Sequence, residues 1–186
     1  MSKYLAYCFL YDAADDLRCD FEILTDEISS MIGFLRSLLG DTDCVAVPEL
    51  VTDLCKINEL MYHINPSLRT KTLVTEEELE WLVQKTSALQ KSLGAQPSKD
   101  GAPTFYIPQG FTQAACSHVI RSKCKTLVRL LSRHHQQGNA VSEILFDFCN
   151  LYSGYFYFLA LWFNKIHGIQ ECPFVSRAYG SSNMKN

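Results

Sequence analysis

Residues 112–137, TQAACSHVIRSKCKTLVRLLSRHHQQ, decide the fold because they predict one long helix with two different faces. Apolar residues recur there at steps of three and four, which places them on the side that a helix presses into a core. These residues are Cys116, Ile120, Cys124, Leu127 and Leu131. The stretch therefore predicts a helix that is buried along one side.

The opposite side of this predicted helix is basic. Its members recur at the same steps and are His118, Arg121, Lys125, Arg129 and Arg133. Cations stacked one turn apart repel each other, so an anionic partner would explain them well. A solvated basic surface explains the pattern equally well when the helix is considered alone.

Composition limits the class of protein. The chain has 186 residues, of which 47% are hydrophobic, and this predicts one domain over residues 1–186. The balance of 17 Lys and Arg against 20 Asp and Glu gives a net charge of -3, which argues against a general nucleic-acid binder. Eight cysteines form no CxxC pair and no cluster at zinc spacing. We therefore expect reduced thiols, a cytoplasmic protein without an export signal, and no metal site.

Hydrophobic periodicity predicts four further helices with short connections. A first helix is expected from Thr25, as N-cap, to Gly40, a second over 48–65, a third over 76–93 and a last over 140–167. Residues 3–11 predict a short strand within an irregular lead-in over 1–23, and residues 179–186 predict a flexible tail. Residues 95–110 predict a loop without regular structure, because three prolines and two glycines interrupt them.

The last predicted helix is apolar on nearly every side, which raises the alternative of a membrane span. Asp147, Asn150 and Gly154 interrupt the apolar run at steps of three and four. A helix with one polar stripe is typical of the centre of a soluble bundle, so we expect no membrane. Five helices with short loops predict an all-α five-helix bundle.

Several enzyme classes lack their signature in this chain. The sequence has no Gly-rich Walker loop, GxGxxG, HExxH or GxSxG motif. His134 and His135 are adjacent, so they point to different sides of a helix and make a poor metal pair. We expect both to be exposed groups near a helix C-terminus.

Three segments together carry a resemblance: TDEISSMIGF (25–34), FYIPQG (105–110) before the basic helix, and NLYSGYFYFLALWFN (150–164). In this order they resemble the propanediol-utilisation type of ATP:cob(I)alamin adenosyltransferase. The motifs of that family read TVDELNSxIG, F-x-x-P-G-G, A-R-T-x-x-R-R-A-E-R and N-R-L-S-D-x-L-F-x-L-A-R-x-x-N. The likeness covers nearly the whole chain, and Arg18 stands where the family has an arginine eight residues before the aspartate.

The resemblance implies a homotrimer of five-helix bundles with active sites between subunits. It implies transfer of the 5′-deoxyadenosyl group of ATP, bound with Mg²⁺, to the cobalt of reduced cobalamin, with triphosphate as the other product. Implied partners are a corrinoid reductase or a cobalamin-dependent enzyme. Catalytic positions would be Asp26, which pairs with Arg121 of a neighbouring subunit, and Phe105, which lies below the corrin ring and favours four-coordinate cobalt. Nucleotide-binding positions would be Lys125, Arg129, Asn150 and Arg18.

The chain departs from the family at its N-terminus. The family begins with a phosphate-binding loop rich in Gly, Thr and Lys, whereas residues 1–17 contain no glycine or threonine. Lys125 replaces a family arginine, and Val128 replaces a glutamate. Two functions therefore remain open: a divergent adenosyltransferase, or a catalytically degenerate relative that binds corrinoid or nucleotide as a carrier, sensor or assembly partner.

Overall fold

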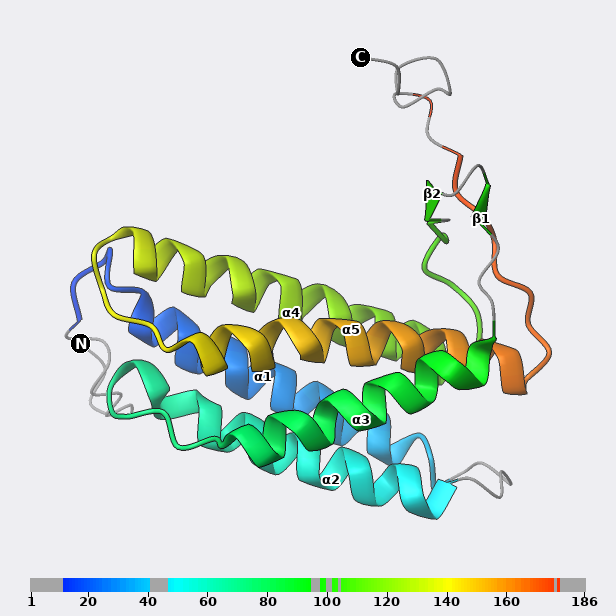
Figure 1. The fold of residues 1–186 in the computed structure, drawn as a ribbon, viewed down its shortest axis with the longest axis horizontal. Coiled ribbons are helices and arrows are strands. Elements are labelled where there is room, and N and C mark those ends of the chain that lie inside the picture. Colours follow the sequence, from blue (N-terminus) through cyan, green and yellow to red (C-terminus); the bar gives the residue numbers. More distant parts are fainter. Residues whose placement is uncertain are drawn as a thin grey trace, which may run out of the picture.

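Five α-helices build the part of the protein that the structure describes, as the sequence predicts. The computed structural model describes residues 12–40, 47–94, 98–99, 102–103, 105–175 and 177. The helices are α1 (Leu17–Ser37), α2 (Val47–Ile64), α3 (Glu76–Leu93), α4 (Thr112–Gln136) and α5 (Glu143–Ile166). They lie roughly along one axis, and consecutive helices run in opposite directions (Figure 1). The all-α class is therefore confirmed.

Helix α1 starts nine residues earlier than the sequence analysis places it, so the prediction of Thr25 as its N-cap is wrong. The cap is Asp16, whose carboxylate accepts the backbone N–H of Arg18 at 3.0 Å. The Thr25 hydroxyl instead donates to the carbonyl of Phe21 at 2.8 Å, inside the helix. The lead-in predicted for residues 1–23 thus ends before Leu17, and the strand predicted within 3–11 lies outside the described residues, as does the tail over 179–186.

The other predicted helix boundaries agree with the structure to within about three residues. Thr75 and Glu78 form the expected capping box: the Thr75 hydroxyl accepts the N–H of Glu78 at 3.3 Å, and the Glu78 carboxylate accepts the N–H of Thr75 at 2.9 Å. Gly94 ends α3 with a φ of 75°. A short 3-10 helix, η2 (Asn65–Leu68), follows α2 and contains Pro66 in its first turn.

The stretch 95–110 is not a plain loop, which corrects the prediction made from its prolines. Strands β1 (Ser98–Lys99) and β2 (Ala102–Pro103) pair antiparallel, with Ser98 opposite Pro103. Proline is tolerated at such an edge because no ladder bond needs its missing N–H. Further along, Tyr106 forms an isolated bridge with Pro173 from the segment that follows α5.

Helix α5 lies against both α3 and α4 and supplies much of the core. Its largest fully buried aromatic side chains are Phe148, Tyr152, Tyr155 and Phe156. The Tyr152 hydroxyl stays satisfied by donating to the carbonyl of Ile57 at 3.1 Å. Among the described helices only α5 is long and apolar enough to cross a membrane, but 56% of its most apolar window is buried by the rest of the chain. Burial of this kind is what a core helix shows.

Candidate functional site

Helices α1 and α4 lie side by side, and an ion pair fixes their relative position. Lys123 Nζ lies 2.6 Å from Oε1 of Glu27. Beside that pair, Asp26 projects from α1 into solvent and accepts a hydrogen bond from the Tyr62 hydroxyl at 3.1 Å. This bond raises the pKa of Tyr62 above its usual value. Asp26 is therefore an exposed carboxylate on α1 that contacts Tyr62 of α2.

Arg121 lies on α4, the helix that Lys123 joins to α1, and is half-buried. Its guanidinium carbon lies 5.6 Å from the ring centre of Tyr157 on α5, a cation–π distance. Its Nε is buried and makes no hydrogen bond within the described residues. The described part of the chain holds no ion pair between Arg121 and Asp26, although their helices are neighbours. Neither charge is neutralised by an ion pair inside this part of the chain.

His118 does not belong to the exposed basic side of α4, which corrects the sequence analysis. Its side chain is only 4% exposed and faces the Tyr157 ring, with the two ring centres 6.4 Å apart. Burial, followed by the nearby charge of Arg121, lowers the pKa of His118 to about 4. Both ring nitrogens lack hydrogen-bond partners among the described residues. His118 is consequently neutral at pH 7.

Three further cations of α4 remain on the surface, as predicted. Lys125, Arg129 and Arg133 are exposed, and within the described chain none of them forms an ion pair. Asn150 is exposed on the neighbouring helix α5. Lys125, Arg129 and Arg133 thus give α4 exposed positive charge that no acidic residue of the described chain neutralises by an ion pair, which suits an anionic ligand.

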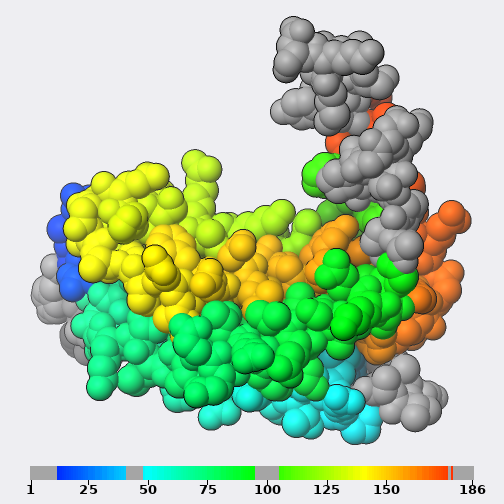
Figure 2. Space-filling model, in the orientation of Figure 1, coloured from blue at the N-terminus to red at the C-terminus, as the bar shows by residue number. Residues whose placement is uncertain are grey.

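Phe105 lies on an arm that residues 105–107 and 172–174 form together, although these two segments are far apart in the sequence. The N–H of Phe174 donates to the carbonyl of Phe105 at 2.7 Å, and the N–H of Ile107 donates to the carbonyl of Cys172 at 2.9 Å. Both segments rise from the same end of the bundle (Figures 1 and 2). Phe105 is 69% exposed and Phe174 is 53% exposed. Exposed aromatic rings held on a hydrogen-bonded arm indicate an apolar binding surface.

Phe174 is a candidate that sequence reasoning missed. The sequence gives little sign of it, because a single phenylalanine after a proline in ECPFV (171–175) does not indicate that this segment pairs with the one around Phe105. The pairing becomes visible only once α4 and α5 place the two segments next to each other.

Arg18 lies at the opposite end of the bundle, where α1 begins and α4 ends. Its Nε contacts both carboxylate oxygens of Asp16, at 2.9 and 3.0 Å. The hydrogen bonds from Arg18 lower the pKa of Asp16 to about 2. Because Asp16 and Asp12 both lie within ion-pair distance of Arg18, its charge is already compensated in this chain. The role of Arg18 in nucleotide binding stays a prediction.

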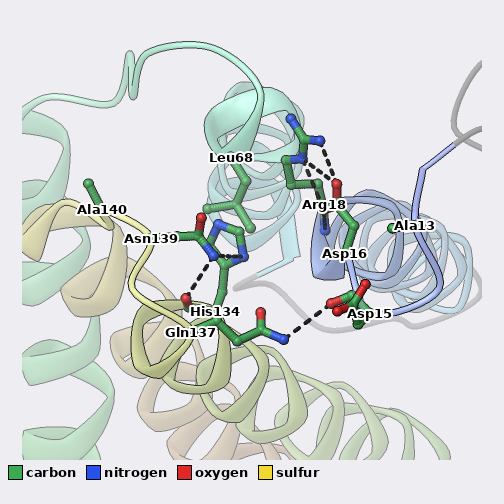
Figure 3. Close-up of a pocket in the computed structure, with 9 residues that line it drawn as sticks. All are labelled: Ala13, Asp15, Asp16, Arg18, Leu68, His134, Gln137, Asn139 and Ala140. Atoms are coloured by element: carbon green, nitrogen blue, oxygen red, sulfur yellow. Dashed lines mark hydrogen bonds and ion pairs between the residues drawn. The ribbon is translucent and has the colours of Figure 1, made fainter.

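A pocket of about 740 Å³ opens beside Arg18 (Figure 3). His134 lines it and is 6% exposed, so the expectation that this histidine lies on the surface is wrong. The Asn139 amide donates to the His134 carbonyl at 3.2 Å, and its Nδ2 lies 3.5 Å from Nδ1 of the ring (Figure 3). Gln137 crosses the pocket and donates to the carbonyl of Asp15 at 3.2 Å. With Asp15 and Asp16 in its wall, this pocket does not resemble a phosphate site.

The chain is similar to known proteins in its family and in its fold. The family model for cobalamin adenosyltransferase matches residues 14–163. A variant PduO-type ATP:corrinoid adenosyltransferase from Lactobacillus reuteri, complexed with cobalamin and ATP, has a TM-score of 0.71 at 20% identity, over 87% of each chain. Another variant from Lactobacillus reuteri, complexed with ATP, has a TM-score of 0.70 at 21% identity, over 86% of this chain and 88% of that one. A search of curated proteins found no match.

Proposed function

Because the chain belongs to the cobalamin adenosyltransferase family, we propose that it transfers the 5′-deoxyadenosyl group of ATP to the cobalt of reduced cobalamin. The cobalt(I) electron pair forms the Co–C5′ bond, the C5′–O5′ bond breaks, and triphosphate leaves with both electrons of that bond. The cofactor is itself the nucleophile, so the protein contributes positioning and electrostatics. The observation that carries the proposal is the row of cations on α4 without ion-pair partners, in a chain that also carries the Phe105–Phe174 arm.

The cations of α4 would bind the triphosphate of ATP. Lys125 and Arg129 stand one turn apart and are exposed, so both can donate to phosphate oxygens. Asn150 would supply a neutral hydrogen-bonding group on the nucleotide, and Arg18 would join them from the end of α1. The described residues hold no cluster of three or more Asp, Glu, His and Cys for a metal ion. Mg²⁺ would therefore be held mainly by the phosphates and water, which is common for this ion.

The arm would cover the lower face of the corrin ring. Phe105 and Phe174 present apolar surface and no atom that can ligate cobalt. Keeping a lower ligand away favours four-coordinate cob(II)alamin, which is easier to reduce to the nucleophile. These exposed aromatic rings would become buried when the flat corrin ring binds. Burial of their apolar surface would contribute hydrophobic free energy to binding.

A homotrimer would complete the site, because the charges of Asp26 and Arg121 remain unmatched within the described chain. The surface that would meet a second copy is partly apolar: Ile23 on α1 is 59% exposed, Phe34 is 58% exposed, and Val119 on α4 is 48% exposed. Ile23 and Phe34 lie on the same side of α1 as Asp26, at helical spacing. An Asp26–Arg121 ion pair between two subunits would fix the geometry of this interface, which we call the seam. Such a trimer, acting in the cytoplasm with a corrinoid reductase, agrees with the sequence analysis.

One observation favours the alternative of a relative that binds without catalysing. At the end of α1, where the family's phosphate loop would approach, Asp12, Asp15 and Asp16 surround Arg18 and occupy its charge. Acidic groups there oppose polyphosphate binding. A carrier or sensor would bind corrinoid or nucleotide and release no triphosphate.

An anaerobic turnover assay separates the two functions. The protein is incubated with ATP, cobalamin and a chemical reductant, and adenosylcobalamin is detected by chromatography. We expect product from the wild type and a KM for ATP that rises about tenfold or more in Arg129→Ala, because a charge-assisted phosphate contact is lost. Lys91→Ala is the control, since it removes an exposed cation of α3, a helix that the proposal does not place at the nucleotide, and it should leave KM unchanged. No product from the wild type would favour the carrier.

A further inference from the structure

The base of the arm is held by one fully buried amide. Asn164, at the end of α5, has 0% exposure. Its Oδ1 accepts the N–H of Phe111 at 3.0 Å, and its Nδ2 donates to the carbonyl of Gln109 at 3.0 Å and to Oε1 of Glu171 at 2.8 Å. Its backbone carbonyl accepts the N–H of Ile169 at 2.8 Å. One side chain therefore joins α5 to both segments that continue into the arm.

The backbone beside Asn164 is shaped to admit it. Gly110 has a φ of 118°, a conformation that other L residues rarely adopt. A Cβ atom at this position would lie 2.0 Å from Oδ1 of Asn164 and 2.6 Å from its Cγ. The amide thus occupies the space where any other residue would place its side chain. On the other side of the junction, the rings of Phe111 and His167 stack with centres 3.6 Å apart.

We propose that Asn164 is the positioning residue that holds the Phe105–Phe174 arm in place for the corrinoid, an inference that rests on the proposed function. Gln109 and Phe111 lie at the root of the segment that carries Phe105, and Glu171 lies at the root of the segment that carries Phe174. The two segments are fixed to the same amide before they pair with each other. Asn164 touches no reacting atom and acts through the arm.

The site requires an amide rather than a carboxylate. Asn164 Nδ2 faces two acceptors, the Gln109 carbonyl and the Glu171 carboxylate, while Oδ1 faces one donor. Oε2 of Glu171 is buried without a hydrogen-bond partner among the described residues, and burial raises the pKa of Glu171. An aspartate at position 164 would remove both donors and place a second carboxyl group against Glu171. The double variant Asn164→Asp with Glu171→Gln restores one bond, with the donor and acceptor exchanged.

The experiment uses the wild type, Asn164→Asp, the double variant, and Asn65→Asp as a matched control. Asn65 is half-buried and, like Asn164, its amide donates to two acceptors, the Glu22 carbonyl and the Thr25 hydroxyl, but it lies in η2, away from the arm. Hydrogen exchange of the Ile107 and Phe174 amides reports the arm itself. The four-coordinate band of cob(II)alamin with ATP reports corrinoid positioning, and the Kd of ATP alone reports the nucleotide site.

We expect Asn164→Asp to accelerate exchange at both amides and to reduce the four-coordinate fraction about tenfold, with the Kd of ATP unchanged. The double variant should recover part of both signals, and Asn65→Asp should change neither. Unchanged exchange in Asn164→Asp, a parallel loss of ATP affinity, or no recovery in the double variant would overturn the proposal. A wild type that lacks the band, with accelerated exchange in Asn164→Asp, would overturn the proposed function and leave the arm anchored by Asn164.

Discussion

Lys123 on α4 lies 2.6 Å from Glu27 on α1, and this pair joins the two helices that carry Arg121 and Asp26. The pair is half-exposed and contributes on the order of 0.2–1 kcal/mol to stability. Its importance is geometric. It joins the two helices that carry these charges. Asp26 contacts Tyr62 of α2 and Arg121 contacts the Tyr157 ring of α5, and the described residues offer neither of them an opposite charge at ion-pair distance.

Reversing both charges of the proposed seam tests the assembly. Asp26→Arg and Arg121→Asp, made singly, should shift the protein toward monomers, because each places like charges together across the seam. The double variant should recover the oligomer, since the pair is restored with opposite polarity. Analytical ultracentrifugation measures the species. Asp20→Ala, which removes another exposed carboxylate of α1, is the control, and singles that assemble like the wild type would remove Asp26 and Arg121 from the seam.

Restoring the family's arginine at position 125 should strengthen nucleotide binding. A guanidinium contacts two phosphate oxygens at once, whereas the lysine ammonium acts as a point charge. We expect Lys125→Arg to lower the Kd for ATP by roughly fivefold, a gain of about 1 kcal/mol. Isothermal titration calorimetry with Mg–ATP measures it. An unchanged Kd would show that Lys125 does not face the phosphates.

Glycine 110 should be intolerant of any side chain. Gly110→Ala combines a φ of 118° with a Cβ only 2.0 Å from the Asn164 amide, so the hydrogen bonds of Asn164 must break. We expect a loss of about 1–3 kcal/mol in the free energy of unfolding measured in urea. Gly33→Ala provides the contrast, because nothing lies within 4 Å of a Cβ placed there in α1. That helix variant should gain about 0.5–1 kcal/mol, and equal effects at both positions would contradict the account.

Buried His118 predicts a specific dependence of stability on pH. Its pKa is about 4 in the folded protein against an ordinary value of 6.5. Between these values the unfolded chain binds a proton that the folded chain does not, so stability falls as the pH drops from 6.5 toward 4. Lowering the pH from 7.5 to 5.0 should cost about 2 kcal/mol through this residue.

His118→Gln isolates that contribution. Glutamine has a similar size and does not titrate, so the pH-dependent loss should shrink by the same amount in urea denaturation at the two pH values. An identical pH dependence in wild type and variant would show that the histidine is accessible to protons in the folded state.

The sequence predicts the helices well because periodicity and caps are local signals. Thr75 with Glu78 and Gly94 mark α3 correctly, and the apolar positions of α4 are buried as expected. The start of α1 could not be placed, because Thr25 and Asp16 are both good caps and only burial of Leu17 and Phe21 decides between them. A residue that is suited to an N-cap does not by itself fix where a helix begins. Tertiary packing of the residues that follow it decides the start of α1.

The site is less predictable because it depends on long-range contacts. The exposure of Lys125 and Arg129 follows from the pattern of α4, whereas the burial of His118 depends on Tyr157 from a different helix. The pairing of Phe105 with Phe174 and the bonds of Asn164 join segments more than fifty residues apart. Sequence spacing carries no information about such contacts. The Asp26–Arg121 pair and the roles of Asn150 and Arg18 stay predictions.

A titration of cob(II)alamin into the wild-type protein, with and without saturating ATP, tests the proposed function most directly. Visible and magnetic circular dichroism spectra separate four-coordinate from five-coordinate cobalt. We predict that the four-coordinate signal grows with protein concentration only when ATP is present, because the nucleotide and the corrinoid occupy one site. A cob(II)alamin spectrum that ATP leaves unchanged at every protein concentration would contradict the account.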